Sequence, residues 1–195
     1  MKQYRRAREE MKEKIRAAFW TLYQKDGYQN VMSVKALTDL AKVNRSTFYF
    51  YYQHTGEILD ELISWLKDEI VEIYSSGKRR NGDFNEFYKE MYEYFRRRKK
   101  YLVPLVCESR HPDFALWYRN NQREMFKEDV GLARYRTDKK KNKIIDISLA
   151  GIIEEQIQTF AYGELSIDES FKLEYGMLQK GLLKTLSENF SIYNE

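Results

Sequence analysis

The sequence has little cysteine, proline or glycine. Cys107 is the only cysteine among the 195 residues, so no intrachain disulfide can form, which fits a reducing compartment. Two prolines and nine glycines leave long uninterrupted stretches, and these stretches are rich in residues that favour helices. We therefore expect an all-α fold.

Several functions lack the residues they need. His54 and His111 are the only histidines, so we predict no metal site and no cofactor. Cys107 and His111 have no evident orienting carboxylate, and no glycine motif for phosphates or dinucleotides occurs, so we do not expect an enzyme. No run approaches the roughly 18 apolar residues of a membrane span, and no apolar segment follows the basic N-terminus, so we expect a cytoplasmic protein.

Positive charge is concentrated near the N-terminus. The net charge is +4, but residues 1–53 carry 11 Lys/Arg against 5 Asp/Glu, a net +6, while residues 54–195 carry 23 against 25, a net −2. This asymmetry is typical of a protein in which one module binds a polyanion. The alternative is an ordinary solvated basic surface.

Apolar spacing and helix caps predict a helix-turn-helix in the same region. A long helix from Arg5 to Lys25 has one apolar stripe and ends at KDGY, where Gly27 suits a left-handed cap. Ser33 is the expected N-cap of a short helix over residues 34–41, and Asn44 is the expected cap of a second one. Two short helices joined by such a turn and braced by a long helix are typical of a helix-turn-helix.

Five consecutive aromatic residues, 48–52, lie in the second short helix. Phe48, with Tyr51 or Tyr52, can face the first short helix, whereas Tyr49 and the leading polar residues point away. We therefore expect this helix to be partly core and partly contact surface.

The remaining sequence predicts further helices. Thr55 can cap a helix that continues to about residue 75, followed by a loop at SSGKRRNGD. Later helices are expected over residues 83–98, in a short segment after RRRKKY, from Pro112 onward, and over residues 142–163 and 168–190.

The last two helices are apolar on more than one face and contain mid-helix glycines, each of which costs about 1 kcal/mol relative to alanine. One hypothesis is a dimer interface where backbones approach closely, and the other is an ordinary core pair. The candidate interface residues are Ile145, Gly151, Ile152, Leu178, Leu182 and Leu186.

The segments FWTLYQKDGY and SVKALTDLAKVNRSTFYFYYQHTGEIL, within residues 5–66, resemble the DNA-binding domain of the TetR family of transcriptional regulators. The resemblance implies a helix-turn-helix domain over residues 1–54, a connecting helix over 55–75, and a helical regulatory and dimerisation domain over 76–195, about nine helices in all. The family usually has glycine at the position of Lys42, so we expect a left-handed or strained Lys42 at a cost of about 1 kcal/mol. Gln53 and Thr55 stand where the family often has lysines that contact phosphates.

The resemblance also implies a homodimer that binds a palindromic operator in double-stranded DNA, usually as a repressor, and that a small-molecule effector releases. Arg45 suits a guanine edge, since a guanidinium can donate to both O6 and N7. A packing role for Thr47 and a core role for Tyr51 are the alternatives to DNA contact. The residues assigned to DNA binding are Arg5, Arg6, Ser33, Lys35, Asn44, Arg45, Ser46, Thr47, Tyr49 and Tyr51.

The middle of the chain is rich in aromatic residues, which suit an aromatic or cationic effector. The alternative is that these residues form the core, because aromatics at helical spacing commonly do. The candidate ligand-binding residues are Tyr92, Phe95, His111, Phe114, Trp117 and Tyr118. A rival class is a helical protein-interaction regulator that has no effector or has lost DNA binding.

Overall fold

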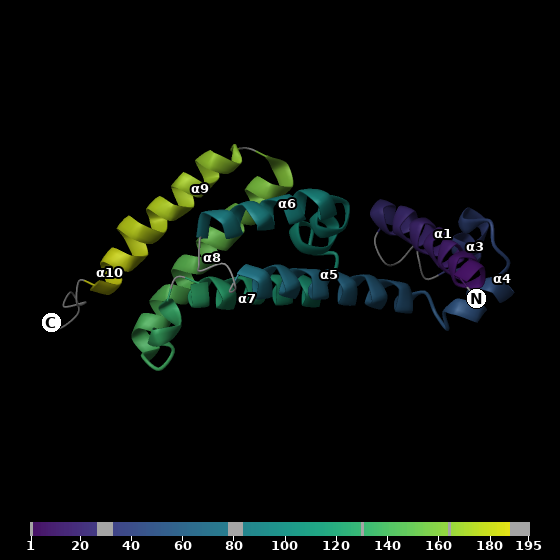
Figure 1. Cartoon of the computed structure of the whole chain (residues 1–195), viewed down its shortest axis with the longest axis horizontal. Helices are drawn as coiled ribbons and strands as arrows, with labels where there is room; N and C mark the ends of the chain where they lie inside the picture. The colour runs from purple at the N-terminus through teal and green to yellow at the C-terminus, as the bar shows by residue number, and fades with distance from the viewer. Residues whose placement is uncertain (1, 27–32, 78–83, 130, 164, 188–195) are drawn as a thin grey trace. The chain divides into compact units, whose positions relative to one another are not determined.

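The computed structural model describes residues 2–26, 33–77, 84–129, 131–163 and 165–187. All regular structure in these residues is helical, and they contain no strand (Figure 1). The expected all-α class is confirmed. None of the described helices combines the length and the apolar content that a membrane span requires.

The chain divides into two compact units, residues 1–70 and residues 71–195. Helix α5 (Gly56–Gly77) begins in the first unit and ends in the second. The functional division expected from the sequence, with a DNA-binding domain over residues 1–54 and a connecting helix over 55–75, stays a prediction.

The first unit contains α1 (Lys2–Asp26), α3 (Val34–Ala41), α4 (Arg45–Tyr51) and the start of α5. Ile15, Phe19 and Tyr23 recur every four residues along α1 and are at most 1% exposed, so they form one buried stripe. Helix α1 packs against α3, which packs against α4. Leu37 and Phe48 also belong to this core and are fully buried. The expected cap Gly27 lies outside the described residues.

A three-residue turn joins α3 to α4. The side chain of Ser33 accepts a hydrogen bond from the Ala36 N–H at 3.3 Å and caps α3, as expected. Lys42 ends α3 with φ 54° and ψ 46°, which confirms the left-handed conformation expected where a glycine is usual. Asn44 occupies the N-cap position of α4, but its side chain makes no capping hydrogen bond, contrary to expectation.

The second unit contains eight described helical elements besides the end of α5, some of them contiguous. They are α6 (Phe84–Leu102), η2 (Val103–Cys107), α7 (Pro112–Asp129), η3 (Leu132–Tyr135), α8 (Lys139–Tyr162), α9 (Ile167–Gly176), η4 (Met177–Leu183) and α10 (Lys184–Ser187). The short helix expected after RRRKKY is not separate, because α6 continues directly into the π-helical η2. The long helix expected over residues 168–190 is the contiguous run of α9, η4 and α10, as far as residue 187.

Helix α8 packs against α6, α7 and α9 in the core of the second unit. Most of the residues predicted for a dimer interface are buried in this core of the single chain, at most 6% exposed: Ile145, Ile152, Leu178, Leu182 and Leu186. Gly151 is exposed. The chain's own core therefore accounts for much of the apolar content that suggested an interface, and the interface itself stays a prediction.

The mid-helix glycines do not mark a close backbone contact within the chain. In the described part, no neighbouring heavy atom lies within 4 Å of the place where a Cβ of Gly151, Gly176 or Gly181 would stand. The expected close approach of a second backbone is therefore not found among the described residues of this chain.

Candidate nucleic-acid interface

Helix α4 has one buried face and one exposed face. Phe48 is fully buried, whereas Tyr49 is 58% and Phe50 is 63% exposed. With 3.6 residues per turn, Ser46 and Phe50 lie nearly opposite Phe48. Tyr49 and Arg45 lie on one flank of the helix, between Ser46 and the buried Phe48, with Arg45 the nearer to Phe48. The aromatic run is therefore divided between core and surface, as expected from its spacing.

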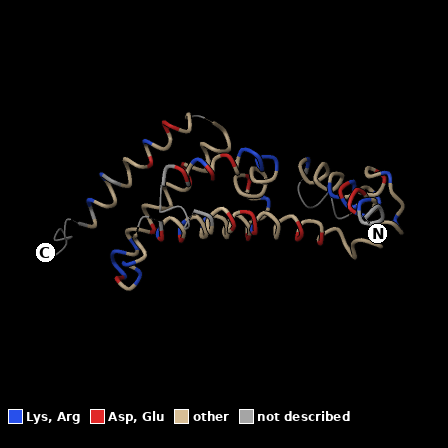
Figure 2. The backbone as a smooth tube through the Cα atoms, viewed as in Figure 1, with Lys and Arg blue, Asp and Glu red and all other residues tan. Residues whose placement is uncertain are grey.

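The N-terminal end of α4 is polar, exposed and positively charged. The side chains of Asn44, Arg45 and Ser46 are exposed, and that of Thr47 is partly buried. No Asp or Glu occurs between Asp39 and Glu57, so the turn and all of α4 are free of negative side chains. Figure 2 shows Lys and Arg on α1 and around the helix-turn-helix. Such a surface suits a polyanion.

The preceding helix α3 adds polar groups of its own. Lys35 and Ser33 are both exposed. The Ser33 hydroxyl oxygen already accepts the capping hydrogen bond of α3, but the hydroxyl can still donate to an acceptor such as a phosphate. Both side chains are therefore accessible to a ligand.

The two tyrosines assigned to phosphate contact differ in burial. The Tyr49 ring is exposed and meets the edge of the Phe48 ring, with centroids 5.3 Å apart. Tyr51 is half-buried, and its ring contacts Phe50 with centroids 5.0 Å apart. This half-burial is compatible with both roles considered for Tyr51, packing in the core and contact with DNA.

The basic arm at the start of α1 is only partly described. Arg6 is exposed and pairs with Glu10 at 3.1 Å, a surface ion pair that leaves the guanidinium accessible. The Arg8 guanidinium lies 5.9 Å from the Phe50 ring centroid and 6.0 Å from that of Tyr51, which links α1 to α4. Arg5 belongs to α1, but its side chain lies outside the described part.

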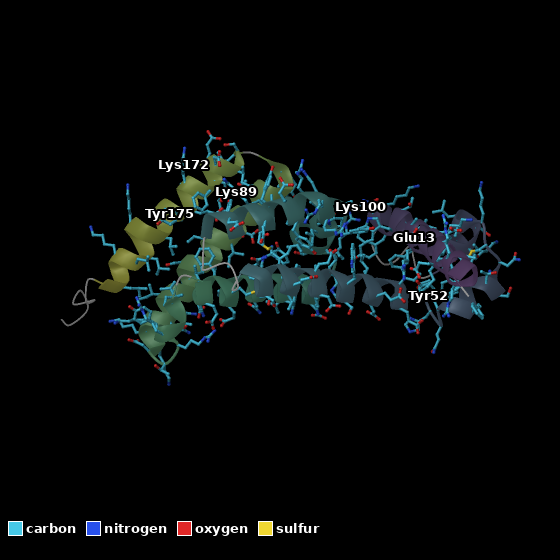
Figure 3. All side chains as sticks on the ribbon, in the orientation of Figure 1. Glu13, Tyr52, Lys89, Lys100, Lys172 and Tyr175 are labelled. Carbon is cyan, nitrogen blue, oxygen red and sulfur yellow. The ribbon has the colours of Figure 1, made fainter. Side chains whose placement is uncertain are left out.

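A polar network around Glu61 of α5 ties three elements of the first unit together. The Glu61 carboxylate accepts hydrogen bonds from Lys12 at 2.6 Å and from Arg16 at 3.1 and 3.2 Å, both of α1. It also accepts one from the Tyr52 hydroxyl at 3.0 Å. Tyr52 lies where α4 ends, as Figure 3 shows. The network therefore fixes the end of α4 against α1 and α5.

Ionisation of Glu61 is favoured by these partners. Partial burial raises the pKa of its carboxyl, but the hydrogen bonds from Lys12, Arg16 and Tyr52 and the charge of Lys12 outweigh burial, and the pKa falls below its ordinary value. Glu61 is therefore charged near neutral pH, and the network is intact there.

The residues predicted for ligand binding fall into two aromatic groups in the second unit. Tyr92 and Phe95 of α6 both contact Phe160 of α8, with centroids 5.2 and 5.7 Å apart. Phe114 of α7 stacks on Trp117 at 5.7 Å and lies 6.5 Å from Tyr118. Phe95, Phe114 and Tyr118 are at most 1% exposed, which agrees with the core alternative for these three. The ligand-binding assignment stays a prediction.

His111 caps a helix, and Cys107 is a free, partly buried thiol. His111 Nδ1 accepts the Phe114 N–H at 3.1 Å and caps the start of α7. Burial raises the pKa of the Cys107 thiol to about 11, so the thiol is protonated near neutral pH. A protonated thiol is a poor nucleophile.

Sequence reasoning missed Phe50 and the Glu61 network. Phe50 was counted with the aromatic run, although its place four residues after Ser46 already set it on the exposed face. The Glu61 network joins residues about 45 apart in sequence, and no local pattern predicts such a contact.

The arrangement matches solved structures of transcriptional regulators. A TetR transcriptional regulator from Streptococcus agalactiae 2603V aligns with a TM-score of 0.62 and 22% identity over 90% of this chain and 97% of that one. A TetR-like transcriptional regulator from Rhodococcus sp. RHA1 aligns with a TM-score of 0.62 and 16% identity over 89% and 96%. This chain has the TetR fold.

The match covers both units, whereas the sequence resemblance was confined to residues 5–66. The second unit of this chain is therefore part of the TetR fold as well. No protein-family model and no curated protein matches the sequence.

Proposed function

We propose that the chain is a DNA-binding transcriptional regulator of the TetR type. It acts as a cytoplasmic homodimer, binds a palindromic operator and represses transcription until a small molecule releases it. It has no catalytic activity and needs no cofactor.

The observation that carries this proposal is the exposed face of α4. A fully buried Phe48 anchors the helix, while Arg45 and Ser46 are accessible at its leading end. A guanidinium can donate twice to guanine, and a hydroxyl can bind several base edges. Arg6, Ser33, Lys35, Tyr49 and Asn44 are exposed in the same unit and are the candidate phosphate contacts, which would set the register of the helix on the duplex.

Dimerisation follows from how little DNA one such helix covers. A single reading helix contacts only a few base pairs, so useful specificity needs two copies on an inverted repeat. Exposed apolar side chains of α8 and of the run from α9 to η4 are available for a second copy: Ile147, Leu173, Tyr175 and Met177.

An effector would act by binding the dimer more tightly at one separation of the two α4 helices than at another. The predicted ligand set has three partly exposed members, Tyr92, His111 and Trp117. The Tyr92 and Trp117 rings suit contact with an aromatic or cationic molecule. The rival proposal is a protein-interaction regulator of the same fold. Thr55 is the observation that favours this rival. The family often has a phosphate-binding lysine at this position, whereas Thr55 is only 4% exposed and cannot make the contact that such a lysine makes.

The first test is the affinity for random duplex DNA as a function of salt. A DNA-binding dimer should lose affinity about tenfold or more between roughly 50 and 200 mM salt, because counterions are released on binding. Fluorescence anisotropy of a labelled duplex measures this directly. Weak binding at both salt concentrations would favour the protein-interaction regulator.

A pair of variants then separates base contact from phosphate contact. Arg45→Ala should relax sequence preference, with a loss of about 1–3 kcal/mol on the preferred sequence, whereas Arg6→Ala should weaken binding to all sequences alike. An Arg45→Ala protein with unchanged preference would show that the base contact is wrongly assigned.

A further inference from the structure

Phe50 is an exposed aromatic side chain that the first unit does not use in its core. It is 63% exposed and lies nearly opposite the buried Phe48 on α4. Single exposed apolar residues are common on protein surfaces. Phe50, however, lies one helical turn after Ser46, within the face proposed to read bases.

The surroundings of Phe50 favour a polyanion over an apolar protein partner. Arg8 holds its guanidinium 5.9 Å from the Phe50 ring centroid, and Arg45 is exposed on the same helix. No acidic residue occurs between Asp39 and Glu57. The surface is therefore an apolar ring beside one cation, Arg8, on a helix without negative side chains, which complements a negatively charged ligand that also presents an apolar group.

Duplex DNA presents one such group to a protein in its major groove. Phenylalanine has no atom that can bond to a phosphate or to a polar base edge, so it can gain only from apolar contact. The C5-methyl group of thymine is the apolar group that the major groove offers. Tyr49, with its hydroxyl, suits a phosphate instead.

We propose that Phe50 is a specificity-determining residue that packs on the C5-methyl group of a thymine in each half-site. Arg8 positions the ring through its cation–π contact. Ser46 and Phe50 lie about 6 Å apart along the helix axis, which is roughly two base-pair steps. The thymine is therefore within about two base pairs of the position that the leading end of α4 reads. This inference rests on the proposed DNA binding.

The test replaces thymine by deoxyuridine, which lacks only the methyl group. In a duplex selected from a random pool by the wild-type protein, each thymine of a half-site is replaced in turn and the affinity is measured. One position should lose about four-fold per half-site, which is the ~0.8 kcal/mol expected for one buried methyl-sized group. Phe50→Ala should show the same loss on the thymine duplex and no further loss on the deoxyuridine duplex.

Two control variants are measured on the same thymine and deoxyuridine duplexes. Tyr49→Ala should bind more weakly but keep the deoxyuridine sensitivity, because its contact is to the backbone. Leu116→Ala removes an equally exposed apolar side chain, 60% exposed, from the second unit, and should bind both duplexes like the wild type. The thermal unfolding midpoint of each variant confirms that it folds.

The outcomes separate this inference from the proposed function. A wild-type protein that binds its selected duplex but is insensitive to deoxyuridine everywhere contradicts the thymine contact alone. The same conclusion follows if Phe50→Ala stays sensitive at the same position, or if the selected half-sites contain no thymine. A wild-type protein that selects no sequence at all contradicts DNA binding itself, and the Phe50 inference falls with it.

Discussion

Two single residues, Lys42 and Glu174, adopt states that are unfavourable for their side chains. Lys42 adopts the left-handed conformation that a glycine usually occupies at this turn. Glu174 is a carboxyl group that is only 1% exposed. Both choices cost folding free energy, so both can be tested by replacing one side chain.

Replacing Lys42 by glycine should stabilise the first unit. A left-handed conformation costs a residue with a Cβ about 1–2 kcal/mol, and glycine avoids this cost but loses more backbone entropy on folding. We expect a net gain of about 1 kcal/mol for Lys42→Gly in chemical denaturation. Lys42→Ala keeps the Cβ and should give no gain, and equal stability of the two variants would contradict the strain.

Replacing Glu174 by glutamine should stabilise the second unit increasingly as the pH rises. Burial raises the pKa of Glu174 to about 8, with Glu155 adding to the shift and hydrogen bonds from Tyr88 and Ser170 opposing it. The folded chain therefore keeps a proton that the unfolded chain releases above its ordinary pKa near 4.5. By linkage, folding stability falls between about pH 4.5 and pH 8 and then levels off.

The measurement is urea denaturation of wild type and Glu174→Gln from pH 5 to pH 9. The amide removes the ionisation and can still accept the Tyr88 hydrogen bond. The variant should be close to wild type at pH 5 and more stable by a few kcal/mol at pH 9. A difference that does not change with pH would show that Glu174 is not buried as described.

The α-helices of this chain could be predicted from local sequence signals, whereas its π-helical segments could not. The spacing of Ile15, Phe19 and Tyr23, the Ser33 cap and the Pro112 start all predicted helices that the structure contains. These signals are local, since a cap or a stripe is defined within one or two turns. The π-helical segments η2 and η4 have no such signal, because a switch from α to π spacing depends on packing against neighbours.

The exposed end of α4 could be predicted from the sequence, whereas the burial of α8 could not. The polar leading end of α4 follows from its amphipathic pattern, although the side-chain cap expected from Asn44 does not form. The burial of Ile145 and Ile152 was not predictable, because a helix that is apolar all round can face its own core or another copy. Which of these occurs depends on the tertiary packing of α8.

The brace between α1, α4 and α5 can be tested by Glu61→Gln. The substitution removes the charge that Lys12 and Arg16 share and weakens the bond from Tyr52. Partly exposed ion pairs contribute little individually, so we expect a loss of about 1–2 kcal/mol for the network in chemical denaturation. Glu13→Gln, at an exposed carboxylate on the same α1 (Figure 3), should change stability by less than about 0.5 kcal/mol. Equal losses would contradict the brace.

At the scale of the whole molecule, the TetR fold spans nearly the entire chain, while the net positive charge is confined to residues 1–53, since residues 54–195 carry a net −2. The proposed function accounts for this asymmetry, because it assigns binding of a polyanion to the first unit and binding of a partner copy or an effector to the second. The exposed face of α4 is the point on which the proposed function depends.

Selection of bound sequences from a random duplex pool by the purified full chain tests this central claim most directly. We predict enrichment of an inverted repeat whose half-sites are centred about one helical turn of DNA apart or a multiple of it, and loss of that enrichment when Arg45 and Ser46 are both replaced by alanine. A pool that stays random with the wild-type protein, or an enriched sequence that the double variant selects equally well, would contradict the claim that α4 reads DNA.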